Sequence, residues 1–200
     1  EAVTGKPFDE YVREQFYEPL NMVTTTYKPR ERFELNNIVP TETEKHFRMQ
    51  QIHGDVHDEG AAMFGGVAGH AGLFSNAYDL AQLYQMLLNG GTLNGKQFLK
   101  KETIEKFTSY QSDISRRGLG FDKPEKDNAT RKEAYPSKSA SAQTFGHTGF
   151  TGICVWVDPQ YKLIYIFLSN RVTPTRNNNK LGQLNVRPNI QEAIYSAIIQ

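Results

Sequence analysis

The segment from Phe145 to Gly152 holds the residues of this chain whose types and spacing best suit chemistry. Its glycines, Gly146, Gly149 and Gly152, come just before an apolar strand that begins at Ile153. Because glycine has no side chain, a substrate can approach such a backbone closely, and N–H groups there can donate to a carbonyl oxygen that gains negative charge. The pattern is typical of one wall of an acyl-transfer pocket. A bulge or bend in a sheet explains the same spacing equally well.

Two strands and a helix are expected to position this segment. The strands run over 153–157 and 163–169, and the Asp158-Pro159 turn between them makes an antiparallel hairpin. The apolar spacing predicts four helices, which start at Pro7, at Asn76, at about Lys101 and behind Pro188. The predicted helices come early in the chain, and the hairpin and one more helix come last. This order favours the α+β class, with the C-terminal helix packed on the sheet.

The C-terminal helix has an apolar stripe that we expect to face the sheet. Its members are three and four residues apart: Ile190, Ala193, Ile194, Ala197 and Ile198. Two other regions lack such periodicity. Residues 24–51 contain two prolines and mixed charges, which favours an irregular segment that runs over the surface. Residues 123–141 are rich in Lys, Asn and Ser, which predicts a mobile loop.

Composition argues for one ordinary globular domain over residues 1–200. Hydrophobic residues make up 38% and charged residues 22% of the chain. Lys and Arg number 23 against 22 for Asp and Glu, so the formal net charge of +1 argues against nucleic acid as a partner. The longest apolar run, 163–168, is far shorter than the roughly 20 residues that cross a bilayer, which argues against membrane insertion. The single cysteine, Cys154, excludes an internal disulfide.

Four stretches in the same order carry a resemblance to a known superfamily. They are Thr4-Gly5-Lys6-Pro7-Phe8 with Glu18-Pro19-Leu20-Asn21-Met22, Gly69-His70-Ala71-Gly72-Leu73-Phe74-Ser75, His147-Thr148-Gly149, and Leu168-Ser169-Asn170-Arg171. With these residues the chain resembles the C-terminal part of the serine β-lactamase and penicillin-binding-protein superfamily, especially class C β-lactamase-related serine hydrolases of the Bacteroides type. The resemblance implies a truncated β-lactamase/transpeptidase-like fold with a helical subdomain, and a periplasmic or secreted bacterial protein.

In that superfamily a serine of a Ser-x-x-Lys motif attacks an amide or ester, aided by a Tyr-x-Asn tyrosine, while a Lys-Thr-Gly strand lines the opposite wall. The triplet His147-Thr148-Gly149 matches the third motif, with histidine in place of lysine. The resemblance therefore implies substrate binding by His147, Thr148 and Gly149, and an oxyanion-hole role for the backbone N–H of Phe150. By position, His70 resembles a pocket-lining residue, although loop packing explains it equally well.

The other two motifs are missing from the chain. No serine has a lysine three positions later, and no tyrosine has an asparagine two positions later. We therefore expect a fragment that is inactive alone, whose parent is a serine hydrolase completed by an N-terminal half of the domain. The parent would act on a small-molecule or peptide substrate, such as a cell-wall peptide or a β-lactam, without a cofactor.

The histidine at position 147 bears on the substrate. A histidine is mostly neutral at pH 7, whereas the usual lysine attracts a substrate carboxylate. We therefore expect weaker capture of penicillin-like carboxylates and more esterase or peptidase character, and His147→Lys should raise turnover of carboxylate-bearing β-lactams.

Two alternatives to the hydrolase fragment stay open. One is a non-catalytic module of the same fold that binds a peptide or cell-wall ligand. The other is a metal-dependent hydrolase that uses His53, His57 and His70, although the glycines after them favour loops and no metal ligand is assigned.

Overall fold

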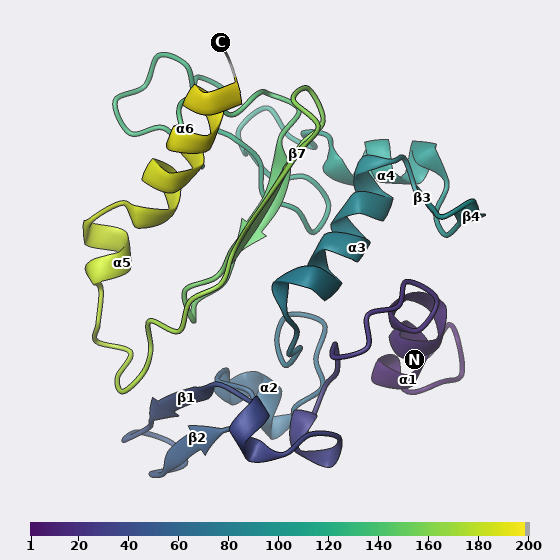
Figure 1. Ribbon diagram of the computed structural model, residues 1–200, viewed down its shortest axis with the longest axis vertical. Helices are drawn as coiled ribbons and strands as arrows, with labels where there is room; N and C mark the ends of the chain where they lie inside the picture. Colours follow the sequence, from purple (N-terminus) through teal and green to yellow (C-terminus); the bar gives the residue numbers. More distant parts are fainter. Residues whose placement is uncertain (199–200) are drawn as a thin grey trace. The chain divides into compact units, whose positions relative to one another are not determined.

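The computed structural model describes residues 1–198 and divides the chain into two compact units (Figure 1). The first unit consists of Glu1–Leu83 and Leu168–Asn179, and the second of Tyr84–Phe167 and the chain from Lys180 onward. The predicted single domain over 1–200 stays a prediction, and each unit is described by itself.

Short elements make up the first unit. In chain order these are α1 (Phe8–Val12), the π-helical η1 (Arg13–Tyr17), η2 (Pro29–Glu31), η3 (Leu35–Asn37), β1 (Pro40–Thr43), β2 (Gln51–His53), α2 (Glu59–Met63) and the start of α3 (Ala77–Leu88). Pro7 caps α1 as expected, and Asn21 adopts the left-handed conformation with φ +57°. The antiparallel hairpin of β1 and β2 lies in the region read from sequence as an irregular excursion.

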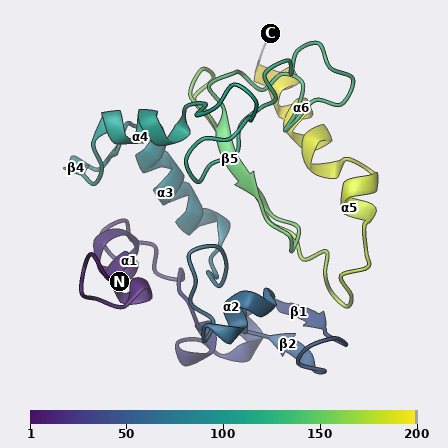
Figure 2. The same cartoon turned by 180° about the vertical axis from the view of Figure 1, so that it is seen from behind.

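The second unit contains the sheet that carries the predicted site. After α3 come β3 (Thr92–Leu93), β4 (Lys96–Gln97), α4 (Lys101–Thr108), β5 (Phe145–Thr148), β6 (Cys154–Asp158), β7 (Leu163–Phe167), α5 (Lys180–Gln183) and α6 (Val186–Ile198). The last three strands form one antiparallel sheet in the order β5-β6-β7, beside which α6 runs in Figure 2, while β3 and β4 pair as a separate two-stranded sheet. The predicted hairpin is thus confirmed as β6 and β7.

The core of the second unit forms where β6 meets its neighbours. All five residues of β6 are buried, and its Cys154 and Trp156 cluster with Tyr165 of β7. Burial raises the pKa of the Cys154 thiol to about 11, as suits a buried apolar side chain. Ile194 of α6 packs against this cluster. The α+β prediction, with antiparallel strands and a C-terminal helix packed on them, is therefore confirmed.

The buried face of α6 differs from the predicted stripe. Gln191 and Tyr195 are the buried residues of this helix, whereas Ile190 and Ile198 are exposed. The Tyr195 hydroxyl donates to Oδ2 of buried Asp158 at 2.6 Å, and of the predicted stripe Ile194 packs against the core cluster.

Segment 123–141 holds no helix or strand in the described chain, and it contains buried polar groups that hydrogen-bond to one another. Lys123, Asn128 and Ser137 are buried. Asn128 Nδ2 donates to the Ser137 carbonyl at 2.8 Å, and the Tyr135 N–H donates to Asn128 Oδ1 at 2.7 Å. Its mobility stays a prediction, and these bonds would have to break for the segment to move.

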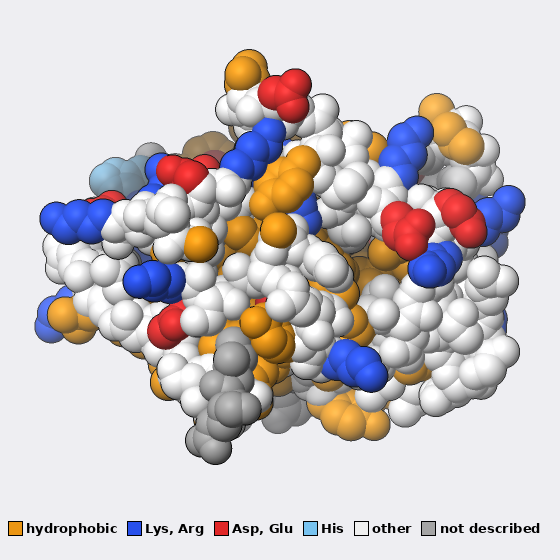
Figure 3. All heavy atoms as spheres, turned by 90° about the horizontal axis from the view of Figure 1, so that it is seen from above, with side chains coloured by type: hydrophobic (Ala, Val, Ile, Leu, Met, Phe, Trp, Pro, Cys, Tyr) orange, Lys and Arg blue, Asp and Glu red, His pale blue; other side chains and the backbone are white. Residues whose placement is uncertain are grey.

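The surface carries both charges. Basic and acidic side chains are interspersed on the face shown in Figure 3, as the balanced composition leads one to expect. Among residues 1–198, none of the helices is both long enough and apolar enough to span a bilayer.

Candidate functional site

The predicted site residues 147–150 lie together at the end of β5. His147 and Thr148 are the last residues of the strand, paired with Val155 and Cys154 of β6. Gly149 then starts the turn to β6, where its N–H donates to the Ile153 carbonyl at 2.9 Å. The pairing of β5 with β6 runs without a break in register, so the strand has no bulge there.

The three glycines of this run serve different purposes. A Cβ on Gly146 would lie 2.0 Å from the Val155 carbonyl oxygen, so only glycine permits β5 to pair with β6 at this position. Gly152 has φ +118°, a conformation that L side chains rarely adopt, and its N–H donates to the Gly149 carbonyl at 3.1 Å. Gly149 and Gly152 therefore belong to a bend, whereas Gly146 is required because β6 packs too closely for a side chain.

Phe150 lies at the surface, with 61% of its area exposed. His147 is also exposed, and Thr148 and Gly149 are half-buried. The residues expected to face a substrate are thus accessible from solvent within their unit. The oxyanion-hole role of the Phe150 N–H stays a prediction.

The hydrogen-bond partners of His147 favour one tautomer of its imidazole. Nδ1 lies 2.6 Å from the Thr148 carbonyl oxygen, which can only accept, so Nδ1 carries a proton. Nε2 lies 2.8 Å from Nη1 of Arg117, which can only donate, so Nε2 presents a lone pair. The imidazole in this arrangement is neutral, and the cation at this position is the guanidinium of Arg117.

Arg117 reaches the strand from the segment before it in the sequence. Its side chain is 51% exposed, and its Nε lies 3.6 Å from Oδ1 of buried Asp122. The sequence argument for weak carboxylate capture considered only the replacement of lysine by histidine. Arg117 returns a permanent positive charge to the same position, so the premise of that argument is incomplete.

Asp122 is the centre of a larger network. Arg116 donates to both of its carboxylate oxygens, from Nε at 2.8 Å and from Nη2 at 3.2 Å, and the Tyr135 hydroxyl donates at 2.8 Å. Burial by itself raises the pKa of Asp122, but the bonds from Arg116 and Tyr135 outweigh it and lower the pKa. Asp122 is therefore a buried anion among donors.

Tyr135 completes this network. Burial together with the bond to Asp122 raises the pKa of Tyr135 to about 12, so its hydroxyl keeps its proton. The Tyr135 ring packs edge-on against Trp156 at 5.4 Å between centroids, and the Arg116 guanidinium lies 4.4 Å from its centre.

His70, the other predicted site residue, belongs to the first unit. Its Nε2 lies 3.1 Å from Oδ1 of Asp58, and both side chains are substantially exposed. Asp58 also caps α2, because the same oxygen accepts the N–H of Ala61 at 2.8 Å. The role of His70 as a substrate-binding residue stays a prediction.

The histidines of the metal alternative have separate partners. His53 bonds the Ile38 carbonyl at 2.6 Å, and His57 bonds Glu42 at 2.8 Å. Among the described residues, no group of three His, Cys, Asp or Glu side chains is arranged to hold a metal ion.

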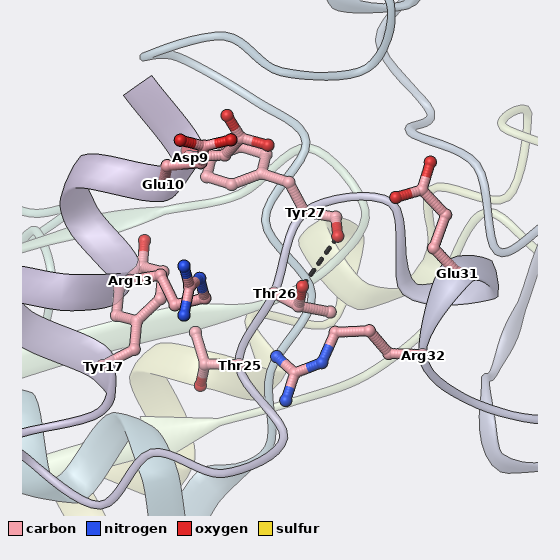
Figure 4. Close-up of a pocket in the computed structure, with 9 residues that line it drawn as sticks. All are labelled: Asp9, Glu10, Arg13, Tyr17, Thr25, Thr26, Tyr27, Glu31 and Arg32. Atoms are coloured by element: carbon pink, nitrogen blue, oxygen red, sulfur yellow. Dashed lines mark hydrogen bonds between the residues drawn. The ribbon is translucent and has the colours of Figure 1, made fainter. Parts of the chain in front are cut away.

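A cavity of about 150 Å³ lies elsewhere in the first unit, between α1, η1 and the chain from Thr25 to Arg32 (Figure 4). Arg13 and Arg32 line it together with the acidic Asp9 and Glu10. No predicted site residue borders it.

Sequence reasoning missed Arg117, Asp122 and Tyr135. Their distances along the chain from His147 follow no motif, and only the pairing of Asp122 with Gly146 brings them to the strand. The adjacent arginines Arg116 and Arg117 before a glycine-rich stretch were the one available signal.

With this geometry established, comparison with known proteins decides the family. Residues 1–186 match the family described as Beta-lactamase. The chain belongs to this family. It is 37% identical over 221 residues to a protein of Escherichia coli (strain K12) named "Putative D-alanyl-D-alanine carboxypeptidase", covering 100% of this chain and 50% of that protein. A protein of the same name from Salmonella enteritidis PT4 (strain P125109) is 35% identical over 202 residues, covering 95% and 45%.

Solved structures agree on the fold of this Beta-lactamase family member. A beta-lactamase from Mycobacterium bovis superposes with a TM-score of 0.62 at 21% identity, over 98% of this chain and 58% of that one. A penicillin-binding-protein homologue from Caulobacter crescentus gives 0.55 at 21% identity, over 84% and 48%. The β-lactamase/transpeptidase-like fold is thereby confirmed. The chain spans about half the length of the curated relatives it matches.

Proposed function

We propose that this chain forms the substrate-binding wall of a serine hydrolase domain, whose nucleophilic serine lies in a part of the protein outside the 200 residues. The observation that carries the proposal is the exposed His147-Thr148-Gly149 end of β5 with the Arg117 guanidinium beside it. In the complete domain the serine forms an acyl-enzyme, and the Phe150 N–H donates to the oxyanion of the tetrahedral intermediate.

The substrate is an amide or ester that carries a carboxylate near the scissile bond. A neutral His147 offers that carboxylate no charge, but the half-exposed guanidinium of Arg117 has free donor capacity in a fork that matches a carboxylate. A peptide with a free C-terminal carboxylate fits this description, and it is the type of substrate named for the D-alanyl-D-alanine carboxypeptidase relatives. A cell-wall peptide is therefore the substrate class we propose, in a periplasmic or secreted protein.

The first test is covalent labelling of the full-length protein with a fluorophosphonate probe. A serine outside residues 1–200 should be labelled, and a protein truncated to these residues should not be labelled at all. Carboxylate-dependent peptide binding without labelling would instead identify the non-catalytic module. Activity that is lost with a chelator and without serine labelling would identify the metal-dependent alternative.

The second test concerns the carboxylate. Arg117→Gln should raise the KM of the full-length enzyme for a peptide with a free C-terminus by about 10- to 100-fold, since a charge-assisted hydrogen bond contributes about 1.5–3 kcal/mol. The C-terminally amidated peptide should change much less. Arg131→Gln is the matched control, because Arg131 pairs with Glu125 at 2.9 Å in the same unit and does not contact His147. Equal loss for both peptides would contradict the assignment of Arg117.

A further inference from the structure

We propose that Asp122 is the positioning residue of this wall, which orients His147 through Arg117. The consequence for catalysis rests on the proposed function above, whereas the positioning itself can be measured without any turnover. No motif marks Asp122, and it does not face the substrate, since it is buried.

The backbone of Asp122 is fixed to the site strand. Its N–H donates to the Gly146 carbonyl at 2.7 Å, and the Gly146 N–H donates back to its carbonyl at 3.0 Å. Gly146 immediately precedes His147, so this pair of bonds holds the Asp122 carboxylate at a constant distance from the residues that follow in β5.

The network reaches His147 through Arg117. Arg116 already occupies both carboxylate oxygens of Asp122 with direct hydrogen bonds, so Arg117 keeps only a longer ion pair of 3.6 Å from its Nε. That contact holds the base of the guanidinium and leaves Nη1 to donate to Nε2 of His147 at 2.8 Å. The donor at Nε2 in turn selects the Nδ1–H form of the imidazole.

Tyr135 holds the carboxylate of Asp122 in place. Its hydroxyl donates to Asp122 Oδ2 at 2.8 Å. The ring cannot turn away easily, because Trp156 and the Arg116 guanidinium pack against it. The orientation of His147 thus depends, through Arg117, on a carboxylate that packed groups hold.

The positioning is tested by NMR of the full-length protein labelled with ¹⁵N at histidine only. The wild type should show His147 as a neutral imidazole with its proton on Nδ1. Asp122→Asn, which keeps the shape and removes the charge, should abolish this single tautomer. A His147 signal that is unchanged in a folded Asp122→Asn protein would overturn the proposal, even if the protein turned out to have no hydrolase activity.

Arg117→Ala covers the case in which Asp122→Asn fails to fold, because the Arg117 side chain is 51% exposed. It removes the donor that faces Nε2 of His147, so the single tautomer should be lost there too. Arg131→Ala is the matched control, because Arg131 pairs with Glu125 at 2.9 Å and does not contact His147, and it should keep the tautomer. A single His147 tautomer that is retained in Arg117→Ala would overturn the proposal.

Kinetics of the full-length enzyme then show whether positioning matters for turnover. Asp122→Asn should raise KM for a free C-terminal peptide about tenfold or more, and the double variant with Arg117→Gln should be no worse in KM than Arg117→Gln alone. Additive losses would overturn the assignment of Asp122 as acting through Arg117. If the wild type shows no turnover while the NMR results hold, the proposed function fails and the positioning role stands.

Discussion

Each unit of the molecule contains a buried carboxylate that pairs with arginine. The two arrangements differ in whether an arginine guanidinium is enclosed or faces solvent. In the first unit Glu42 accepts from Nε of Arg176 at 2.9 Å and bonds His57 at 2.8 Å, and Arg176 also pairs with Glu59 at 2.7 Å. Arg176 is thus enclosed between two carboxylates, with 23% of its side chain exposed.

In the second unit the charge is not enclosed. Asp122 holds Arg116 directly and Arg117 at a longer distance, and Arg117 points its remaining donors toward the exposed His147. A buried carboxylate and an arginine therefore have two different roles in the two units. An arginine closed between two acids ties chain segments together, whereas an arginine held by one shared acid presents a cation to solvent.

The largest expected effect separates the two arginines by stability. Arg176→Ala should lower the free energy of unfolding by about 3–5 kcal/mol, because it leaves Glu42 buried without its cation. Arg117→Ala should lower it by less than about 1 kcal/mol, since Asp122 keeps Arg116 and Arg117 is half-exposed. Urea unfolding of both variants measures this, and similar losses would remove the distinction drawn here.

A second prediction tests the backbone on which the Asp122 network depends. Gly146→Ala should destabilise the protein by about 2–3 kcal/mol, because the added Cβ would meet the Val155 carbonyl, which cannot move without breaking the strand pair. Gly69→Ala is the control, because nothing lies within 4 Å of a Cβ there. Thermal unfolding of the two variants should differ clearly, and equal midpoints would show that β5 accommodates the methyl group.

A third prediction concerns pH and another enclosed carboxylate, Glu44. Burial raises its pKa, but bonds from the Arg48 side chain and from the Phe47 and Arg48 N–H groups outweigh this and lower the pKa from 4.5 to about 2. A lowered pKa in the folded state stabilises the protein above pH 4.5, and this contribution is lost as the pH falls toward 2. Glu44→Gln should therefore be less stable than wild type at pH 7, with a deficit that has closed by about pH 2 in urea unfolding. A deficit independent of pH would contradict it.

The smallest expected change in stability comes from Arg117→Lys. The free energy of unfolding should change by less than about 0.5 kcal/mol, because the site is exposed. Lysine has one nitrogen and cannot pair with Asp122 and donate to His147 from separate atoms, so the single His147 tautomer should still be lost. Histidine NMR together with urea unfolding measures both, and a retained tautomer would show that charge alone suffices.

Local signals in the sequence predicted the local parts of the fold. The apolar runs and the Asp158-Pro159 turn gave the β6–β7 hairpin, and Asn21 adopts the conformation that its side chain tolerates. The resemblance placed His147, Thr148 and Gly149 on a sheet strand, and the structure places the end of β5 at Thr148. These features depend on residues close together in the chain.

The parts that sequence did not predict depend on distant contacts. β1 forms where Thr43 donates to the Pro174 carbonyl and Arg176 bonds Glu42, more than 130 residues apart. The buried residues of α6 include Tyr195, which bonds Asp158 of the sheet, whereas Ile190 and Ile198 of the aliphatic pattern are exposed. Asp122 matters because it pairs with Gly146, and no periodicity encodes that pairing.

The strand order makes β7 an edge strand when these 200 residues are produced alone. Within the described chain β7 pairs only with β6, so the outer edge of Leu-Ile-Tyr-Ile-Phe has backbone groups without a strand partner. This strand contains no charged residue and no proline, the residues that commonly prevent edge-to-edge pairing. Another copy of the chain can add a strand to such an edge, so we expect fibrous aggregation at high protein concentration during purification.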